Sequence, residues 1–83
     1  MIHILFFARL REQLGCSNLD LDWSEELASV KALRAQLQSH SPEWAQALGA
    51  DNIVVAVNQQ QVDVEHAIAA GDEVAFFPPV TGG

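Results

Sequence analysis

The side chains that most often carry chemistry are few in this sequence of 83 residues, and they are spread along it. The histidines, His3, His40 and His66, have no spacing that puts two of them on one face of a helix or strand. We interpret them as surface residues rather than metal ligands. Cys16 is the single cysteine, and without a second thiol or a neighbouring base it predicts neither an iron–sulfur site nor a nucleophile.

The carboxylates also give no clear acid and base pair. Asp20 and Asp22 alternate with apolar residues, and Glu25 is followed directly by Glu26, so both sets are typical of solvated faces and turns. The alternative is a pair that folding brings together. The glycines stand singly at expected turns or at the end of the sequence, which does not match a phosphate-binding loop. The sequence therefore favours a protein without an internal active site.

The C-terminal segment Pro78-Pro79-Val80-Thr81-Gly82-Gly83 is the remaining candidate for chemistry. Two prolines favour an extended path, and the residues after Phe77 could reach up to about 20 Å from the domain. Gly82 and Gly83 have no Cβ, so they could enter a channel too narrow for side chains and leave an α-carboxylate at the tip. A carboxylate becomes a good electrophile when a partner that uses ATP converts it into an acyl adenylate. We therefore predict that the reactive group is the carboxylate of Gly83; the alternative is an inert, frayed end.

Composition excludes several classes of function. Eleven acidic residues against four basic ones give a net charge of −7, which repels a nucleic acid backbone and favours a basic protein surface as partner. The apolar runs are far shorter than the roughly 18 residues that a membrane span needs. A lone cysteine and the absence of a leader pattern predict a reduced, cytoplasmic protein.

Alternating and uniformly apolar segments predict five strands. They cover residues 2–8, 19–23, 53–57, 61–64 and 73–77. The first two are expected to form a hairpin across a polar turn that contains Arg11, Glu12 and Gly15. The segment 53–57 is the most apolar and is expected to be central in the sheet.

Two helix starts follow the second strand. Ser29 is a predicted N-cap before Val30, Leu33 and Leu37, whose spacing gives one apolar face. Ser41 and Pro42 repeat the start signal for a shorter helix that Gly49 ends. This order of elements predicts an α+β fold of the β-grasp, or ubiquitin-like, type: a mixed sheet of about five strands, one main helix and a second short helix. The domain covers residues 1–77, and residues 78–83 form an extended tail.

Strand alternation also predicts a docking surface near the tail. If Ile4 and Phe6 face the helix, Phe7 faces outward, and Phe77 faces outward on the last strand. Two exposed phenylalanines on neighbouring strands are typical of a protein interface. The alternative is that loops or the second helix cover them.

The same alternation sends Gln61 outward and turns Val62 and Val64 inward.

Several motifs resemble those of the MoaD-type small subunits of molybdopterin synthase, a family of ubiquitin-like sulfur carriers. The resemblance covers nearly the whole chain, and its most specific block is the run from Gly71 to Gly83. Further matching segments are Leu5-Phe6-Phe7-Ala8, then Arg11-Glu12 and Gly15, and Val57-Asn58-Gln59.

The resemblance implies a cycle in which a partner enzyme uses ATP and magnesium to adenylate Gly83 and sulfur then replaces AMP to give a thiocarboxylate. The chain itself binds no cofactor. It also implies that the tail, Pro79 to Gly83 through Val80, Thr81 and Gly82, enters the large synthase subunit and delivers sulfur to cyclic pyranopterin monophosphate. The implied assembly is a heterotetramer of two small and two large subunits, with the large subunit providing catalysis.

The predicted partner interface consists of Phe7, Arg11, Gln61 and Phe77, and the resemblance implies that the surface around Phe7 and Phe77 contacts the large subunit and the activating enzyme in turn. Gln61 stands where relatives carry an apolar residue, and an exposed arginine such as Arg11 is commonly only solvated.

Three alternatives remain open at this point. The chain could carry sulfur for thiamine or another product, as ThiS-type carriers do, or it could be a modifier conjugated to proteins. Lys31 is the only lysine, which disfavours a polymerising modifier weakly. The third alternative is an adaptor with an inert tail that acts through Phe7 and Phe77.

Overall fold

A computed structural model of the chain describes residues 1–50 and 53–78. Its elements follow one another as β1 (Ile2–Phe6), α1 (Ala8–Leu14), β2 (Asn18–Leu21), the 3₁₀ turn η1 (Glu25–Leu27), α2 (Val30–Gln38), α3 (Pro42–Leu48), β3 (Val54–Val57), β4 (Gln60–Val62) and β5 (Glu73–Phe77).

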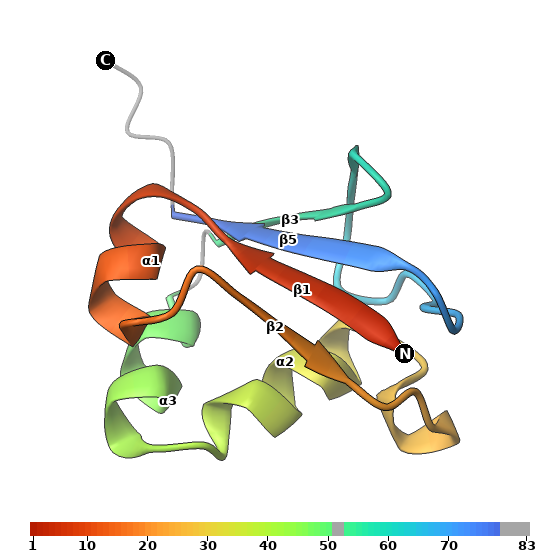
Figure 1. The fold of residues 1–83 in the computed structure, drawn as a ribbon, viewed down its shortest axis with the longest axis horizontal. Helices are drawn as coiled ribbons and strands as arrows, with labels where there is room; N and C mark the ends of the chain where they lie inside the picture. The colour runs from red at the N-terminus through yellow and green to blue at the C-terminus, as the bar shows by residue number, and fades with distance from the viewer. Residues whose placement is uncertain (51–52, 79–83) are drawn as a thin grey trace.

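The strands form one mixed sheet in the order β2-β1-β5-β3-β4, and the helices lie on one side of it (Figure 1). β1 runs parallel to β5, while the other neighbouring strands are antiparallel. The predicted α+β fold with five strands is confirmed, including the pairing of β1 with β2. The apolar segment 53–57 contains β3, which is an interior strand paired with β5 and β4 as expected, although β5 occupies the middle position of the sheet.

The core lies between the sheet and the helices. Ile2, Ile4 and Phe6 of β1 are buried, as strand alternation predicts. The ring of Phe6 meets the ring of Trp44 of α3 edge to face at a centroid distance of 5.4 Å, and it lies 5.9 Å from the ring of Phe76. These contacts fix α3 against the β1–β5 pair. Within residues 1–50 and 53–78, no helix covers the opposite face of the sheet.

The segment expected to be a polar turn after β1 is the helix α1, so this prediction was wrong. Leu10 and Leu14, four residues apart, are its buried residues, and Gly15 ends it in the left-handed conformation with φ of 64°. The first strand consequently ends at Phe6 rather than at residue 8. Arg11 lies in the last turn of this helix, where a cation is favoured by the helix dipole.

Both predicted serine caps are confirmed. Ser29 Oγ accepts a hydrogen bond from Ala32 N at 3.1 Å, and Ser41 Oγ accepts one from Trp44 N at 3.2 Å. Arg34 of α2 also fixes the end of α3, because its guanidinium donates to the backbone oxygens of Leu48 and Ala50. The helices thus have defined ends on the same side of the sheet.

Two strand predictions need correction at their ends. β2 ends at Leu21, and the Trp23 indole beyond it donates to Ile68 O at 2.9 Å. β4 ends at Val62, and Val64 is 39% exposed rather than inward. The chain turns after β4 because the Asp63 carboxylate accepts a hydrogen bond from Glu65 N, a local bond typical of aspartate turns.

A two-residue turn joins β3 to β4, and it gives a first testable prediction. Asn58 and Gln59 have φ values of 52° and 70°, a conformation that favours asparagine and glycine. We expect Gln59→Gly to raise the free energy of unfolding by about 0.5–1 kcal/mol, because glycine removes the Cβ strain at positive φ. Urea unfolding measures this, with Gln60→Gly on β4 as a control that should destabilise. Equal losses in both variants would contradict the turn geometry.

Candidate protein-docking site

Phe7 and Phe77 form a stacked pair on the outer side of the sheet. Their ring centroids are 4.8 Å apart and the ring planes differ by 5°. Phe7 is 39% exposed and Phe77 is half-buried. The prediction that both side chains point away from the core is confirmed, and no described residue covers the Phe7 ring completely. An exposed aromatic pair of this kind suits a protein interface.

The backbone between β1 and α1 presents Phe7 to this face. Phe7 is still extended, and its N–H donates to Phe76 O at 3.2 Å, which holds it beside β5. Ala8 then has φ of 53°, a conformation that alanine rarely adopts, and α1 begins there. The chain therefore changes direction within one residue, directly beside the aromatic pair.

The outer face continues across the sheet as a row of paired residues that is apolar up to Ala56 and ends at the polar Gln61. The register places Leu5 beside Ala75, Ala75 beside Ala56, and Ala56 beside Gln61. Residues that pair in register share a face, so exposed Gln61 lies on the same side as Phe77. This confirms that Gln61 points outward, while its contact with a partner stays a prediction.

The tail begins at the edge of this face. Pro78 follows β5 directly and is half-buried. The predicted tail residues Pro79, Val80, Thr81, Gly82 and Gly83 lie outside the described residues. Pro78, the base of the tail, therefore directly follows Phe77 at the end of β5.

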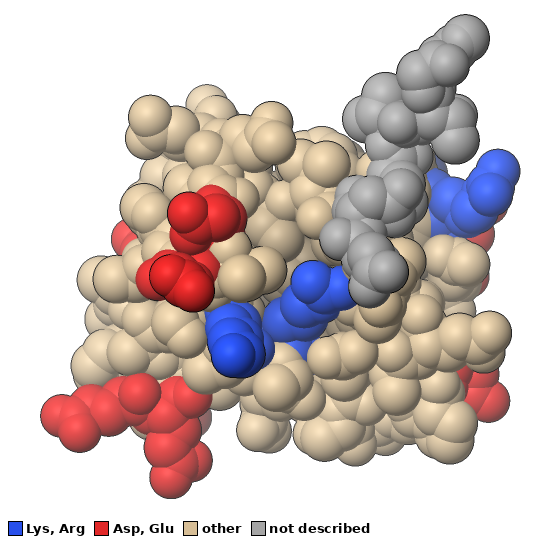
Figure 2. All heavy atoms as spheres, turned by 180° about the vertical axis from the view of Figure 1, so that it is seen from behind, with Lys and Arg blue, Asp and Glu red and all other residues tan. Residues whose placement is uncertain are grey.

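Charge is unevenly distributed over the molecule. In Figure 2 the larger acidic groups lie on the left half of the face shown, with further acidic side chains at its right edge, and basic side chains lie across its middle and at the right edge. Arg11 is exposed on α1 and makes no ion pair with a described residue. A contact between Arg11 and a partner stays a prediction.

The other candidate residues are not brought together. His3 Nδ1 lies 2.7 Å from Asp20 Oδ1 across the β1–β2 pair, and both side chains are 54% exposed, so the pair adds little stability. Cys16 is half-buried, and its thiol donates to Asn18 O at 3.2 Å. Among residues 1–50 and 53–78 no three histidine, cysteine or acidic side chains gather closely enough for a metal ion. Within the same ranges no helix is long and apolar enough to span a bilayer.

A polar network that was not predicted from the sequence fixes the start of β5. Asp72 accepts hydrogen bonds from Ala69 N at 2.8 Å and from Asn58 Nδ2 at 3.1 Å. Asn58 Oδ1 in turn accepts a bond from Glu73 N at 3.0 Å. The signal was present in the two turn sequences, since asparagine and aspartate at turns commonly bond to nearby backbone. The network aligns β5, which carries Phe77.

These bonds give a pH-dependent prediction. The backbone hydrogen bond from Ala69 and the bond from Asn58 hold the pKa of Asp72 below its usual value. Its stabilising effect is therefore complete above the unfolded-state pKa of about 3.9 and is lost as pH falls through the lower folded-state pKa. We expect Asp72→Asn to lower the free energy of unfolding by about 1 kcal/mol at pH 7. The difference from the unsubstituted chain should shrink below about pH 4.

Urea unfolding at pH 7 and at acidic pH measures this difference. Asp22→Asn is the matched control, because the Asp22 carboxylate is exposed and bonds to no described residue. An Asp72→Asn effect that is the same at both pH values would contradict the account.

Comparison with known proteins identifies the family to which this chain belongs. Residues 4–83 match the model of the ThiS family. The chain belongs to the ThiS family. Two curated relatives of this ThiS-family chain, both named molybdopterin synthase sulfur carrier subunit, cover 100% of it and are themselves covered over 100% of their length. The one from Haemophilus influenzae is 42% identical, and the one from Escherichia coli is 45% identical. The resemblance to the MoaD-type carriers is therefore confirmed.

Solved structures agree with the β-grasp fold of this ThiS-family chain. The crystal structure of small archaeal modifier protein 1 (SAMP1) from Haloferax volcanii is 32% identical, with a TM-score of 0.77 over 99% of this chain and 98% of that one. A second match is a chain in the complex of subunits 1 and 2 of molybdopterin-converting factor from Helicobacter pylori. It is 26% identical, with a TM-score of 0.69 over 99% of this chain and 97% of that one.

Proposed function

We propose that this chain is the sulfur carrier subunit of a molybdopterin synthase. The observation that carries the proposal is the full-length identity of 42% and 45% to two subunits of that name. The stacked Phe7 and Phe77 rings support it, because a carrier domain must be held in place while its tail reaches a partner's active site. In this role the chain donates sulfur and the larger subunit supplies the catalytic groups.

The reactive group in this proposal is the α-carboxylate of Gly83. In an activating enzyme that holds ATP and magnesium, a carboxylate oxygen attacks the α-phosphorus and pyrophosphate leaves. The terminal sulfur of a persulfide then attacks the carbonyl carbon of the acyl adenylate and AMP leaves. A thiol cleaves the remaining sulfur–sulfur bond, which leaves a thiocarboxylate on Gly83 and a disulfide on the donor side.

Delivery requires a narrow and extended tail. Pro79 restricts the backbone at the exit from the sheet, and Gly82 and Gly83 have no side chain to obstruct a channel. The tail from Pro79 through Val80 and Thr81 would lie in the large subunit, with the thiocarboxylate at cyclic pyranopterin monophosphate. Two loaded carriers supply the two dithiolene sulfurs, which fits a heterotetramer of two small and two large subunits. The Helicobacter pylori complex of subunits 1 and 2 supports such a pairing.

Reconstitution tests this function. The chain is incubated with an adenylating enzyme, ATP, magnesium, a sulfur donor, a molybdopterin synthase large subunit and cyclic pyranopterin monophosphate. We expect dithiolene formation that requires every component, at two loaded carriers per product. A loaded chain that binds the large subunit but forms no dithiolene, while an authentic carrier does, would contradict the proposal.

A second candidate is a protein modifier, favoured by the match to SAMP1. A modifier forms an amide between Gly83 and a lysine of a target protein, whereas a carrier releases its tail as a free carboxylate. Detection of stable conjugates in cells, with no dithiolene formed in the reconstitution, would favour this candidate. A ThiS-type carrier for thiamine would load sulfur equally well but would not serve the pterin precursor.

A further inference from the structure

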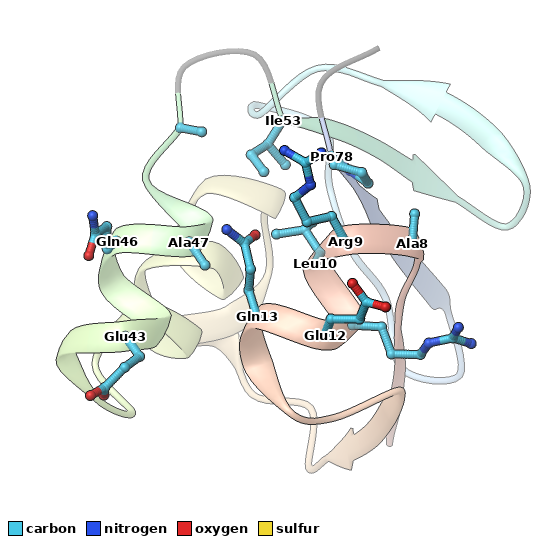
Figure 3. A pocket seen from close by; sticks show the side chains of 12 residues that line it. Ala8, Arg9, Leu10, Glu12, Gln13, Glu43, Gln46, Ala47, Ile53 and Pro78 are labelled. Carbon is cyan, nitrogen blue, oxygen red and sulfur yellow. The ribbon is translucent and has the colours of Figure 1, made fainter. Parts of the chain in front are cut away.

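A groove of about 1030 Å³ lies between α1 and α3, next to the base of the tail. Its floor contains Leu10 and Ala47, and one end is formed by Ile53 and Pro78 (Figure 3). Ala47, with its short side chain, lines the groove between the two helices (Figure 3). Since Pro78 lines this groove and also follows Phe77, the groove is continuous with the proposed docking site.

Among the described residues, four charged side chains line the groove: Arg9, Arg11 and Glu12 of α1 and Glu43 of α3. Arg9 lies at the end formed by Ile53 and Pro78, and Glu43 lies at the opposite end (Figure 3). Both side chains are exposed, and neither forms an ion pair with another described residue. An apolar floor inside a polar rim is the usual composition of a protein interface.

The position of Arg9 is unusual for this chain. Only four basic residues accompany a net charge of −7, and the guanidinium of Arg34 is already engaged by the backbone oxygens of Leu48 and Ala50. Arg9 and Arg11 both line the groove and form no ion pair with a described residue, and Arg9 is the one that lies at the Pro78 end, beside the base of the tail. Charge patterns of this kind set orientation and partner choice more than raw affinity.

We propose that this groove receives a segment of the molybdopterin synthase large subunit, which presents a carboxylate to Arg9, an apolar side chain to the floor and a cation to Glu43. The inference rests on the function proposed above. The groove would provide a second contact with the large subunit, in addition to the one made by the Phe7 and Phe77 rings. The two contacts would lie on opposite sides of the base of the tail. Two contacts on either side of Pro78 would fix the direction in which the tail leaves the domain and enters its channel.

Charge reversals with matched controls test the proposal, with binding of the chain to a purified large subunit measured by calorimetry. We expect Arg9→Glu to weaken binding by at least about tenfold, and Glu43→Lys by a smaller factor. Lys31→Glu and Glu65→Lys make the same changes in net charge at exposed positions outside the groove. These controls should change binding by less than about threefold.

The double variant Arg9→Glu with Glu43→Lys separates a local effect of the groove charges from a general effect of net charge on association. Its net charge equals that of the unsubstituted chain, so long-range attraction is restored while the polarity of the groove is inverted. We expect it to bind more weakly than either single variant. Recovery of normal binding, or equal effects of Arg9→Glu and Lys31→Glu, would overturn the groove proposal.

The outcomes also distinguish this proposal from the function on which it rests. If the unsubstituted chain does not bind the large subunit, the proposed function fails. If it binds and requires Phe7 and Phe77, but the Arg9 and Glu43 variants bind normally, only the groove assignment fails. Thermal unfolding confirms that each variant is folded, which matters for Glu43→Lys because it places a cation in the first turn of α3.

Discussion

Replacing both Phe7 and Phe77 by alanine is expected to weaken binding to the large synthase subunit by at least about 30-fold, or about 2 kcal/mol. The rings stack at 4.8 Å on an open sheet face, so their removal takes away the largest exposed apolar surface beside the tail. Aromatic residues in such positions commonly dominate interface energies. Calorimetric titration of each variant into the large subunit measures the loss.

The same substitutions should leave the fold intact, because Phe7 is 39% exposed and neither ring belongs to the buried core between sheet and helices. Val64→Ala is the matched control, since Val64 is equally exposed at 39% but lies beyond β4 and off the aromatic pair. It should bind normally. Normal binding of the Phe7 and Phe77 double variant, with the control unchanged, would show that the partner uses another surface.

Deleting Gly83 is expected to reduce dithiolene formation by at least about 100-fold without affecting folding. Removal of one residue withdraws the terminal carboxylate by up to about 3.6 Å, and displacements of about 1 Å can already cost a factor of 100. Adding one glycine after Gly83 moves the carboxylate by a similar distance the other way, and we expect a comparable loss of dithiolene formation. Product formation in the complete reconstitution measures both.

Binding provides the internal control for these tail variants. The Phe7 and Phe77 rings are unchanged in them, so the variants should still bind the large subunit and should show the unfolding temperature of the unsubstituted chain. Substantial turnover by the deletion variant would contradict a role for the Gly83 carboxylate, and it would favour an adaptor whose tail is inert.

Much of the fold could be predicted from sequence patterns that report local physics. Alternation along β1 and β5 placed Phe6 and Phe76 in the core and Phe7 and Phe77 outside, because side chains of a strand alternate in direction. The sequence also predicts the helix caps at Ser29 and Ser41, because their hydroxyls accept hydrogen bonds from backbone N–H groups that have no partner within the helix.

What could not be predicted depended on contacts between distant segments. The polar, exposed residues of α1 predict a turn, although Leu10, Leu14 and the terminal Gly15 are also consistent with a helix. The groove between α1 and α3 followed from that helix and was missed with it. The stacking of Phe7 on Phe77 required the parallel pairing of β1 with β5, which no local pattern specifies.

The intact mass of the chain after incubation with an adenylating enzyme, ATP, magnesium and a sulfur donor tests the central claim most directly. The account predicts a gain equal to the exchange of one oxygen for sulfur, located by fragmentation on Gly83 and absent when ATP is omitted. An unchanged mass, under conditions in which an authentic carrier becomes loaded, would contradict it.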